Sequence, residues 1–451
     1  MIQRLRPAPR RIAVANEGNV SSLRLLAGNS LSLIATQLVT SVLGAAYWWY
    51  AARHFSPTAV GVAGAAVSAM LLLGSIANVG LGTLMMGELP RMRSDRTALI
   101  AGGLAASALC GTALGVGAGA LAQYVSPDLA PVSHDSLRLL VFGVGCGATA
   151  AATVLDQALI GLFRGRVQLW RNAFFSVLKL AALFPAAAGA ARGSALAIYA
   201  TWSLGTVVSI AAVIRAVRVS DSGSRPLLAA QWGRLRVLAR AALPHFGFNL
   251  ALQIPAFALP IFAVALLSAR DNASFYVAWQ VVALLFVVPI ALTSVLYPVI
   301  ARDPAGLARI TRLTIITSLA VSAAGILCLA LASEQILGVF GHRYAVSGAT
   351  TLEILALASI PMTIKSHYVA VYRIAGRLAR ALPLVWGAAI LELAAASVGV
   401  QIWGSLRSFS ASWVVMLSVE SLAMIGPVVA ATRVADATAL TARLSGRRRG
   451  D

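Results

Sequence analysis

Runs of apolar residues long enough to cross a bilayer alternate with short polar segments along the chain. A transmembrane helix needs about 20 predominantly apolar residues, and twelve segments of this kind can be identified. They lie at 25–48, 58–86, 97–123, 136–161, 168–191, 194–214, 241–267, 273–300, 313–333, 347–372, 382–403 and 408–431. The pattern predicts an all-α polytopic membrane protein with about twelve transmembrane helices and both termini on one side.

The composition supports a membrane protein. Hydrophobic residues make up 59% of the 451 residues and charged residues only 11%, and the mean hydropathy is +0.83. A soluble protein carries about 25% charged residues. The segments between the predicted spans are short, so we expect no soluble catalytic domain. The three cysteines, Cys110, Cys146 and Cys328, lie in apolar runs without the spacing of a disulfide framework or a zinc site.

The strongly basic charge reports topology. Basic residues outnumber acidic ones by 36 to 15, for a formal net charge of +21. We expect no nucleic-acid partner, because no soluble domain is predicted that could carry a basic patch. The termini and the segments that follow even-numbered spans hold all but six of the arginines, which are Arg53, Arg138, Arg192, Arg270, Arg343 and Arg407. Because arginines accumulate in cytoplasmic loops, we predict that both termini are cytoplasmic.

The spans form two similar halves of six. The segment 163–166 (FRGR) after span 4 resembles 373–377 (RIAGR) after span 10, and transporters are often built from such repeats. The 215–240 segment that joins the halves is consistent with a surface helix, and equally with a basic linker. The predicted organisation is a basic N-terminus at 1–24, a first lobe at 25–214, a linker at 215–240, a second lobe at 241–431 and a basic tail at 432–451.

Ionisable residues inside membrane spans are costly, and they mark ion pairs or transport paths. Lys179 and Lys365 are the only lysines, and both lie in predicted spans. Asp156 lies eight residues before Arg164 and Lys179 eight after Arg171, which places both about 12 Å from the cytoplasmic edge. We therefore predict an Asp156–Lys179 ion pair between neighbouring antiparallel helices.

The second half has the opposite order of charges. Lys365 lies eight residues before Arg373, and Glu392 lies twelve after Arg380, which predicts a Lys365–Glu392 pair. The two predicted pairs would lie pseudo-symmetrically about a central cavity. They either line the transport path or only hold helices together, and both interpretations stay open. Glu420 in the last span has no predicted partner.

Further polar residues are candidate substrate ligands in this cavity. They share a helix face with Asp156 or Lys179, or lie four residues apart on the proline-rich seventh span: Thr149, Asn172, Ser176, Asn249 and Gln253. Arg24, at the start of the first span, is a candidate phosphate ligand, although the positive-inside pattern alone also explains it. Aromatic residues near span ends are predicted to be interfacial belt residues: Trp48, Trp49, Tyr50, Trp403 and Trp413.

Motifs of ATP hydrolysis and of metal or thiol chemistry are missing from the sequence. No Gly-x-x-x-x-Gly-Lys-Ser/Thr, His-Glu-x-x-His or Cys-x-x-Cys motif occurs. A membrane polysaccharide polymerase or glycosyltransferase is the alternative enzyme class, but the outer segments are short, and 53–57 contains no acid. We expect a protein that is not an enzyme and has no cofactor, with H⁺ or Na⁺ as a candidate coupling ion.

Several segments are typical of one transporter family. They are 53–61 (RHFSPTAVG), 80–83 (GLGT), 275–279 (FYVAW), 288–290 (VPI), 296–302 (LYPVIAR), and the Gly-Arg turns at 165–166 and 376–377. In these segments and in span layout, the chain resembles the Wzx-type oligosaccharide-lipid flippases of the multidrug/oligosaccharidyl-lipid/polysaccharide exporter superfamily. The motifs are loose, and no site residue transfers by strict motif.

The resemblance implies a V-shaped exporter whose two six-helix lobes open a cavity alternately to each side. Its expected substrate is an undecaprenyl-diphosphate-linked oligosaccharide, moved from the inner to the outer leaflet of a bacterial cytoplasmic membrane for surface polysaccharide synthesis. Cavity cations, foremost Lys179, Lys365 and Arg24, would meet the diphosphate, and the polar residues would meet the sugar. Polysaccharide polymerase or assembly proteins are the expected partners.

Other transporters remain as alternatives. An ion-coupled drug or small-molecule exporter of the same superfamily is compatible with the span pattern. A lipid II flippase usually has fourteen spans. A major-facilitator carrier also has twelve, but its usual Gly-x-Leu-x-Asp-Arg loop is not matched by 87–91 (GELPR), where arginine takes the Asp position.

Overall fold

The described part of the chain consists of helices joined by short turns. A computed structural model describes residues 35–90, 92, 96–188, 193–220, 232–300, 304–434, 440, 441 and 444, and these ranges contain no strand. A helix over 35–54 is followed by α2 (Pro57–Asn78), α3 (Leu81–Glu88), α4 (Arg96–Val125), η1 (Pro127–Val132), α5 (Ser136–Gly161), α6 (Gly165–Ala186), α7 (Ala195–Ser220), α8 (Trp232–Leu266), α9 (Ala269–Ile300), η3 (Pro304–Gly306), α10 (Leu307–Phe340), α11 (His342–Leu357), α12 (Ser359–Ile374), α13 (Leu378–Trp403) and α14 (Leu406–Ala431).

These helices correspond to the predicted spans. Among the described residues, ten segments are long and apolar enough to cross a membrane, with α11 and α12 counted as one. They match ten of the twelve predicted spans. The other two predicted spans correspond to the helix over 35–54 and to α6, which carries the basic residues Arg166, Arg171 and Lys179. The prediction of an all-α polytopic fold is confirmed.

Two predicted spans are interrupted in the structure. The span 58–86 is divided into α2 and α3 at Val79 and Gly80, whose φ angles of 44° and 80° lie in the left-handed region. The span 347–372 consists of α11 and α12, and Pro361 lies in the first turn of α12, where its missing N–H is tolerated. Local backbone chemistry sets both breaks without changing the direction of the span.

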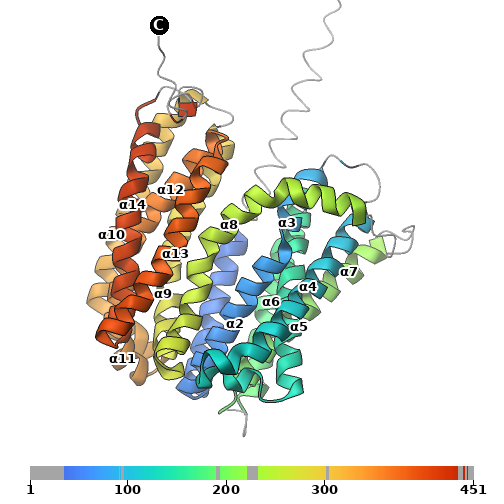
Figure 1. The fold of residues 1–451 in the computed structure, drawn as a ribbon, viewed down its shortest axis with the longest axis vertical. Helices are drawn as coiled ribbons and strands as arrows, with labels where there is room; N and C mark the ends of the chain where they lie inside the picture. The colour runs from blue at the N-terminus through green and yellow to red at the C-terminus, as the bar shows by residue number, and fades with distance from the viewer. Residues whose placement is uncertain are drawn as a thin grey trace, which may run out of the picture.

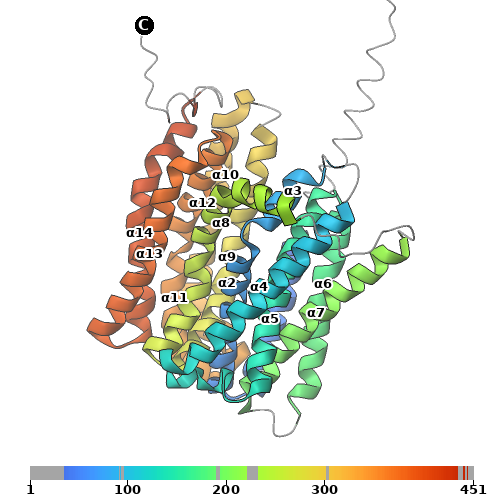
Figure 2. The ribbon, with the colours of Figure 1, turned by 45° about the vertical axis from the view of Figure 1, so that its right-hand side comes forward.

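Both ends of the predicted 215–240 linker are helical. Helix α7 continues to Ser220 and α8 already begins at Trp232. Figures 1 and 2 show that the first part of α8 lies across the bundle before the helix turns to run along it. Prolines at 244, 255 and 260 each remove a helical N–H bond from α8, and prolines are a common cause of such bends.

The molecule has two lobes. In Figure 1, α2 to α7 lie on the right and α9 to α14 on the left, with α8 between them. We call the described residues 35–220 the first half and 232–434 the second half. Helix α14 ends at the upper end of Figure 1, which we call the predicted cytoplasmic end; the lower end is the predicted outer end. Helices α2 and α9 start at the outer end, where the two halves meet.

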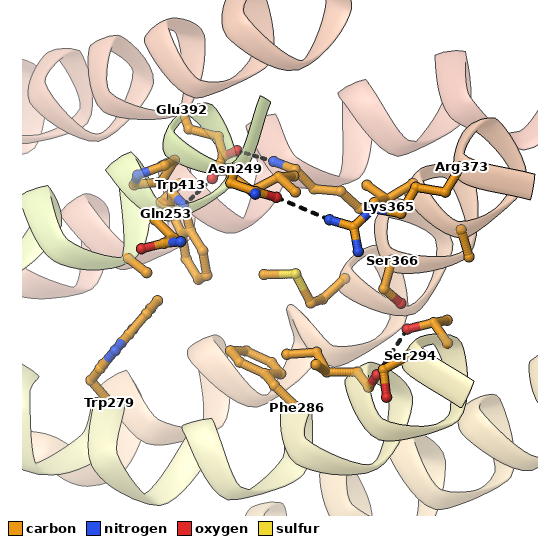
Figure 3. A pocket seen from close by; sticks show the side chains of 18 residues that line it. Asn249, Gln253, Trp279, Phe286, Ser294, Lys365, Ser366, Arg373, Glu392 and Trp413 are labelled. Atoms are coloured by element: carbon orange, nitrogen blue, oxygen red, sulfur yellow. Dashed lines mark hydrogen bonds and ion pairs between the residues drawn. The ribbon is translucent and has the colours of Figure 1, made fainter. Parts of the chain in front are cut away.

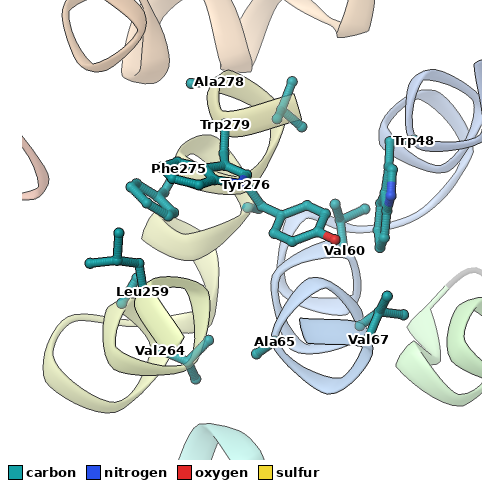
Figure 4. Packing of buried hydrophobic residues seen from close by; sticks show 14 of the residues in the cluster. Trp48, Val60, Ala65, Val67, Leu259, Val264, Phe275, Tyr276, Ala278 and Trp279 are labelled. Atoms are coloured by element: carbon teal, nitrogen blue, oxygen red, sulfur yellow. The ribbon is translucent and has the colours of Figure 1, made fainter. Parts of the chain in front are cut away.

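Close packing between α2 and α9 joins the halves. A Cβ at Gly61 would collide with the carbonyl oxygen of Ala269, and one at Gly64 would lie 2.8 Å from the Tyr276 ring. Tyr276 also contacts Trp48, with ring centroids 4.5 Å apart (Figure 4). Trp48 is therefore buried between the halves, and its predicted place in an interfacial belt is wrong. Small residues allow this close approach of the two helix backbones.

Polar contacts also join the halves at the predicted outer end. Asn272 Nδ2 donates to the carbonyl oxygen of Gly61 at 2.7 Å, and Arg53 Nε donates to that of Val339 at 2.7 Å. Both bonds run from one half to the other. They hold the starts of α2 and α9, and the ends of the 35–54 helix and α10, against one another.

Candidate functional site

A buried ion cluster lies between α12, α13 and α14 in the second half. The Nζ atom of Lys365 lies 2.5 Å from Oε1 of Glu392 and 2.7 Å from Oε1 of Glu420. Trp413 Nε1 donates to the other oxygen of Glu392 at 2.7 Å. All four side chains are at least 95% buried. We call these four residues the Lys365 cluster; when all its groups are ionised, one cation faces two carboxylates and the net charge is −1.

Local sequence explains how three helices meet around this lysine. The buried face of α13 near Glu392 consists of small residues, including Ala388, Ala389 and Ala396, which let neighbouring helices approach closely. On α12, the buried ring of His367 contacts the Thr363 carbonyl and the Thr314 hydroxyl of α10. These contacts fix the helix that carries Lys365.

A cavity of about 410 Å³ opens beside the Lys365 cluster. Lys365, Glu392 and Trp413 form part of its wall, together with residues of α8 and α9 (Figure 3). Aromatic and other apolar side chains, such as Trp279 and Phe286 of α9, make up most of the remaining surface. A largely apolar cavity with a few convergent polar groups is the usual form of a small-molecule site.

The amide residues predicted on span 7 line this cavity. Asn249 Oδ1 accepts a hydrogen bond from Nη2 of Arg373 at 2.9 Å, and Gln253 Oε1 accepts one from Ser75 of α2 at 3.0 Å. Arg373 lies eight residues after Lys365 on α12 and also lines the cavity. Within the described part of the chain, no carboxylate is paired with Arg373, so its charge is available to a ligand.

The predicted pairing in the second half is confirmed, and the structure extends it. The Lys365–Glu392 ion pair forms, and Glu420, which had no predicted partner, also binds Lys365. Trp413 was predicted to be a belt residue, and that prediction is wrong because its indole is buried on Glu392. Its position seven residues before Glu420 places both on one helix face.

The predicted Asp156–Lys179 pair of the first half is wrong. Asp156 instead binds Arg171, with contacts of 2.8 and 2.7 Å, and Asn172 Nδ2 donates to it at 3.1 Å. Helices α5 and α6 are joined by a turn near Phe163, and Asp156 and Arg171 lie equally far from it along the chain. The predicted pair assumes that Arg171 marks the membrane edge, whereas this residue lies about two turns inside α6.

Lys179 lies deeper and is surrounded by aromatic rings. Its Nζ atom is 3.6 Å from the ring centroid of Trp202, 4.5 Å from that of Phe175 and 5.0 Å from that of Tyr47. The lysine is only 2% exposed, and no ion pair reaches it from the described residues. Cation–π attraction is strongest over tryptophan and grows when the cation is desolvated. The aromatic rings therefore replace the predicted carboxylate.

Thr149 and Ser176 do not line the second-half cavity. The Thr149 hydroxyl donates to the Gly145 carbonyl of its own helix at 2.8 Å. Ser176 is fully buried, and its hydroxyl has no partner among the described atoms. Arg24 lies outside the described residues. The predicted central, pseudo-symmetric site is therefore two separate arrangements, of which only the second-half one borders this cavity.

Sequence reasoning missed several cavity residues. Trp279 and Phe286 line the cavity but were not predicted to do so. Their spacing of seven residues, which places them on one face of α9, could have indicated it. Arg373 was counted only as a topology marker, although 365, 366, 369 and 373 follow one face of α12. A basic residue at a span end satisfies the positive-inside rule whether or not it also binds a ligand.

Comparisons with known proteins show the fold. No known family model matches the sequence, and no curated protein matches it. An inward-facing multidrug resistance MATE family transporter of the MOP superfamily matches with a TM-score of 0.69 and 15% identity over 89% of this chain and 99% of that one. An outward-facing structure of such a transporter gives 0.60 at 15% identity, over 91% and 97%. A MOP superfamily transporter from Pyrococcus furiosus gives 0.59 at 15%, over 91% and 97%.

These similarities show the fold of the chain. The chain has the two-lobed fold of the MATE transporters of the MOP superfamily, over about nine tenths of its length. It is a multi-pass membrane protein with a transporter fold, and its structural neighbours are transporters rather than enzymes. The narrower assignment to Wzx-type flippases does not follow from the fold.

Proposed function

We propose that the chain is an ion-coupled exporter that takes amphipathic organic molecules into the second-half cavity. The cavity wall carries this proposal, since it combines an aromatic surface with the buried Lys365 cluster. Aromatic rings bind apolar and cationic groups of many shapes. The MATE fold supports export of small molecules at least as well as lipid flipping.

The Lys365 cluster is proposed to couple ion movement to substrate movement. Lys365 neutralises one carboxylate, and Oε2 of Glu420 is buried without a hydrogen-bond partner among the described residues. A proton or a sodium ion at Glu420 would remove the net negative charge. Because a ligand shifts a conformational equilibrium only by binding one state better, ion binding here would favour one opening of the cavity.

Dye uptake into inside-out membrane vesicles tests this proposal. Wild-type vesicles are expected to accumulate a fluorescent organic cation, and Glu420→Gln is expected to reduce the initial rate at least tenfold. Glu334→Gln, at an exposed position on α10, is the matched control and should keep the wild-type rate. Equal rates for Glu420→Gln and the control would contradict the proposed role of the cluster.

Flipping of an undecaprenyl-diphosphate-linked oligosaccharide is the second candidate function, and Arg373 favours it. Its guanidinium lines the cavity, and its only hydrogen-bond partner among the described residues is the amide of Asn249. Arginine recognises phosphate oxygens through paired N–H groups. On this proposal the protein works in the cytoplasmic membrane of a bacterium, with both termini cytoplasmic and with polysaccharide polymerase or assembly proteins as partners.

A gene deletion separates the two functions. A flippase mutant accumulates lipid-linked oligosaccharide on the cytoplasmic leaflet and loses surface polysaccharide. Arg373→Gln should then fail to restore the polysaccharide, whereas Arg215→Gln, at an exposed arginine of α7, should restore it. Unchanged surface polysaccharide in the deletion strain would exclude the flippase function. It would not bear on the proposed export of organic molecules.

A further inference from the structure

A second cavity lies at the predicted outer end, where the two halves meet. Its volume is about 560 Å³, and it is lined by the turn between the 35–54 helix and α2 and by the turn between α10 and α11. It shares no residue with the second-half cavity. The lining turns mark the ends of membrane spans, so this cavity is at the depth of the lipid headgroups.

The ionisable side chains of this outer cavity are all basic apart from a tyrosine. Arg53 and His54 come from the first half, and His342 and Arg343 come from the second half. No acidic residue lines the cavity within the described part of the chain. Two of the six arginines on the predicted outer side thus line the same cavity. The rule that places arginines on the cytoplasmic side does not explain this clustering.

Donor groups in the outer cavity remain available. Within the described ranges, Arg53 donates only from its Nε atom, to the carbonyl of Val339, and its terminal N–H groups have no partner there. The side chain of Arg343 forms no hydrogen bond or ion pair with the described residues. Tyr344 is 3% exposed, and its buried hydroxyl has no partner among the described atoms. An unsatisfied buried hydroxyl is costly, which indicates that another group completes it.

Two helix N-termini add to the positive potential. Helix α11 begins at His342 after Gly341, whose φ of 142° is favoured only for glycine, and it has no side-chain cap. Helix α2 begins at Pro57 on the same cavity. Because helix N-termini carry partial positive charge, they reinforce the attraction of the arginines for an anion.

We propose that this outer cavity binds a phosphoryl group and thereby bridges the two halves. Arginine pairs well with tetrahedral phosphate oxygens, and phosphate esters are the abundant anions at headgroup depth. A volume of about 560 Å³ falls within the range of about 300–1,000 Å³ for small organic ligands, so the site accepts a phosphate with a substituent. Because each half supplies donors, binding stabilises the arrangement in which the outer ends are together.

Carbethoxylation of histidines in the purified full-length protein gives a local readout of binding. His54 and His342 line the outer cavity, whereas His134 is an exposed histidine outside it, with a side chain 72% exposed. Modification rates are measured by mass spectrometry against increasing inorganic phosphate, or against short-chain phosphatidic acid with diacylglycerol of the same tails as control. The rates at His54 and His342 should fall, while the rate at His134 stays constant.

Substitution of the arginines tests whether they bind the phosphoryl group that protects the histidines. Arg343→Gln should weaken the apparent affinity at least about tenfold, as expected for a lost charged hydrogen bond. Arg343→Lys should keep part of the affinity, and Arg407→Gln, an exposed arginine at the same end, should keep all of it. Protection by phosphatidic acid alone identifies a lipid source, and protection by inorganic phosphate alone a free anion. The proposed site would be overturned if neither probe protects the two histidines, or if the double variant Arg53→Gln/Arg343→Gln is protected as well as the wild type. The modification rates of His54 and His342 do not depend on transport activity.

Discussion

At the residue scale, the two lysines illustrate two ways to keep a cation inside a membrane protein. Lys365 is held by two carboxylates at 2.5 and 2.7 Å, whereas Lys179 is held by the rings of Trp202, Phe175 and Tyr47. Burying charge is costly unless a partner compensates it. The loss of each lysine should therefore have a different consequence for folding.

Removing the Lys365 cation should destabilise the protein strongly. Lys365→Met leaves Glu392 and Glu420 facing each other without a counter-charge, at an expected cost of about 3–5 kcal/mol in the free energy of unfolding. Lys365→Met combined with Glu392→Gln should recover part of this loss. Denaturant titration in detergent measures both. If Lys365→Met is as stable as the wild type, the lysine does not compensate the charge of the two carboxylates.

Removing the Lys179 cation should cost little stability. Lys179→Met leaves no carboxylate without a partner in the described structure, and its side chain keeps most of the apolar contacts with Trp202 and Phe175. The expected change in the free energy of unfolding is within about 1–2 kcal/mol, the range of cation–π energies. The same titration checks this, with Lys365→Met as the contrasting variant. A loss of 3 kcal/mol or more would reveal a missing ionic partner.

The sequence-based pairing of charges depended on how well the membrane edge could be located. In the second half the estimate placed Lys365 beside Glu392, and the ion pair forms. In the first half, Arg171 lies inside its helix and forms the ion pair with Asp156. Because the depth of Lys179 was counted from Arg171 as if this residue were at the membrane edge, the predicted position of Lys179 was wrong by about two turns. Aromatic rings that replace a counter-charge, such as Trp202, lie far from Lys179 in sequence and at no fixed spacing, so a sequence pattern does not reveal them.

At the element scale, the apolar runs predicted the helices well because a span must satisfy its own backbone hydrogen bonds. Interruptions inside runs were less predictable, since Val79 adopts a left-handed conformation that valine rarely takes. The cavity also depends on elements far apart in sequence, α8 and α9 with α12 to α14. Which face of each helix points to the cavity is set by packing between helices, and a single sequence does not encode that contact map.

Contact between α2 and α9 should depend on Gly61. Gly61→Ala places a methyl group against the Ala269 carbonyl and displaces the Asn272 bond, at an expected cost of about 1–3 kcal/mol in the free energy of unfolding. Gly426→Ala is the matched control, because a Cβ there meets nothing within 4 Å. Thermal and denaturant unfolding of both variants check the difference. Equal stability of the two variants would mean that the helices are not in close contact.

At the scale of the whole molecule, the arginine distribution fixes the predicted orientation. The outer cavity, the Asn272–Gly61 bond and the Arg53–Val339 bond all lie at the end opposite to the last turn of α14. On the proposed export function, these contacts would hold the outer ends of the two halves together in one state of the transport cycle.

Orientation is tested by labelling introduced cysteines from one side of the membrane. In a background without Cys110, Cys146 and Cys328, Ser133→Cys lies at the predicted outer end and Thr432→Cys at the predicted cytoplasmic end. A membrane-impermeant maleimide added to intact cells should label the first and not the second. The opposite result would reverse the assigned direction of transport.

Transport by the purified protein in proteoliposomes tests the proposed ion-coupled export most directly. A fluorescent organic cation is supplied with an imposed proton gradient, an imposed sodium gradient or neither. We predict uphill movement of the dye under one of the two gradients, none without a gradient, and loss of this dependence in Glu420→Gln but not in Glu334→Gln. The account is contradicted if the wild type moves no dye under either gradient, or if Glu420→Gln transports with unchanged ion dependence.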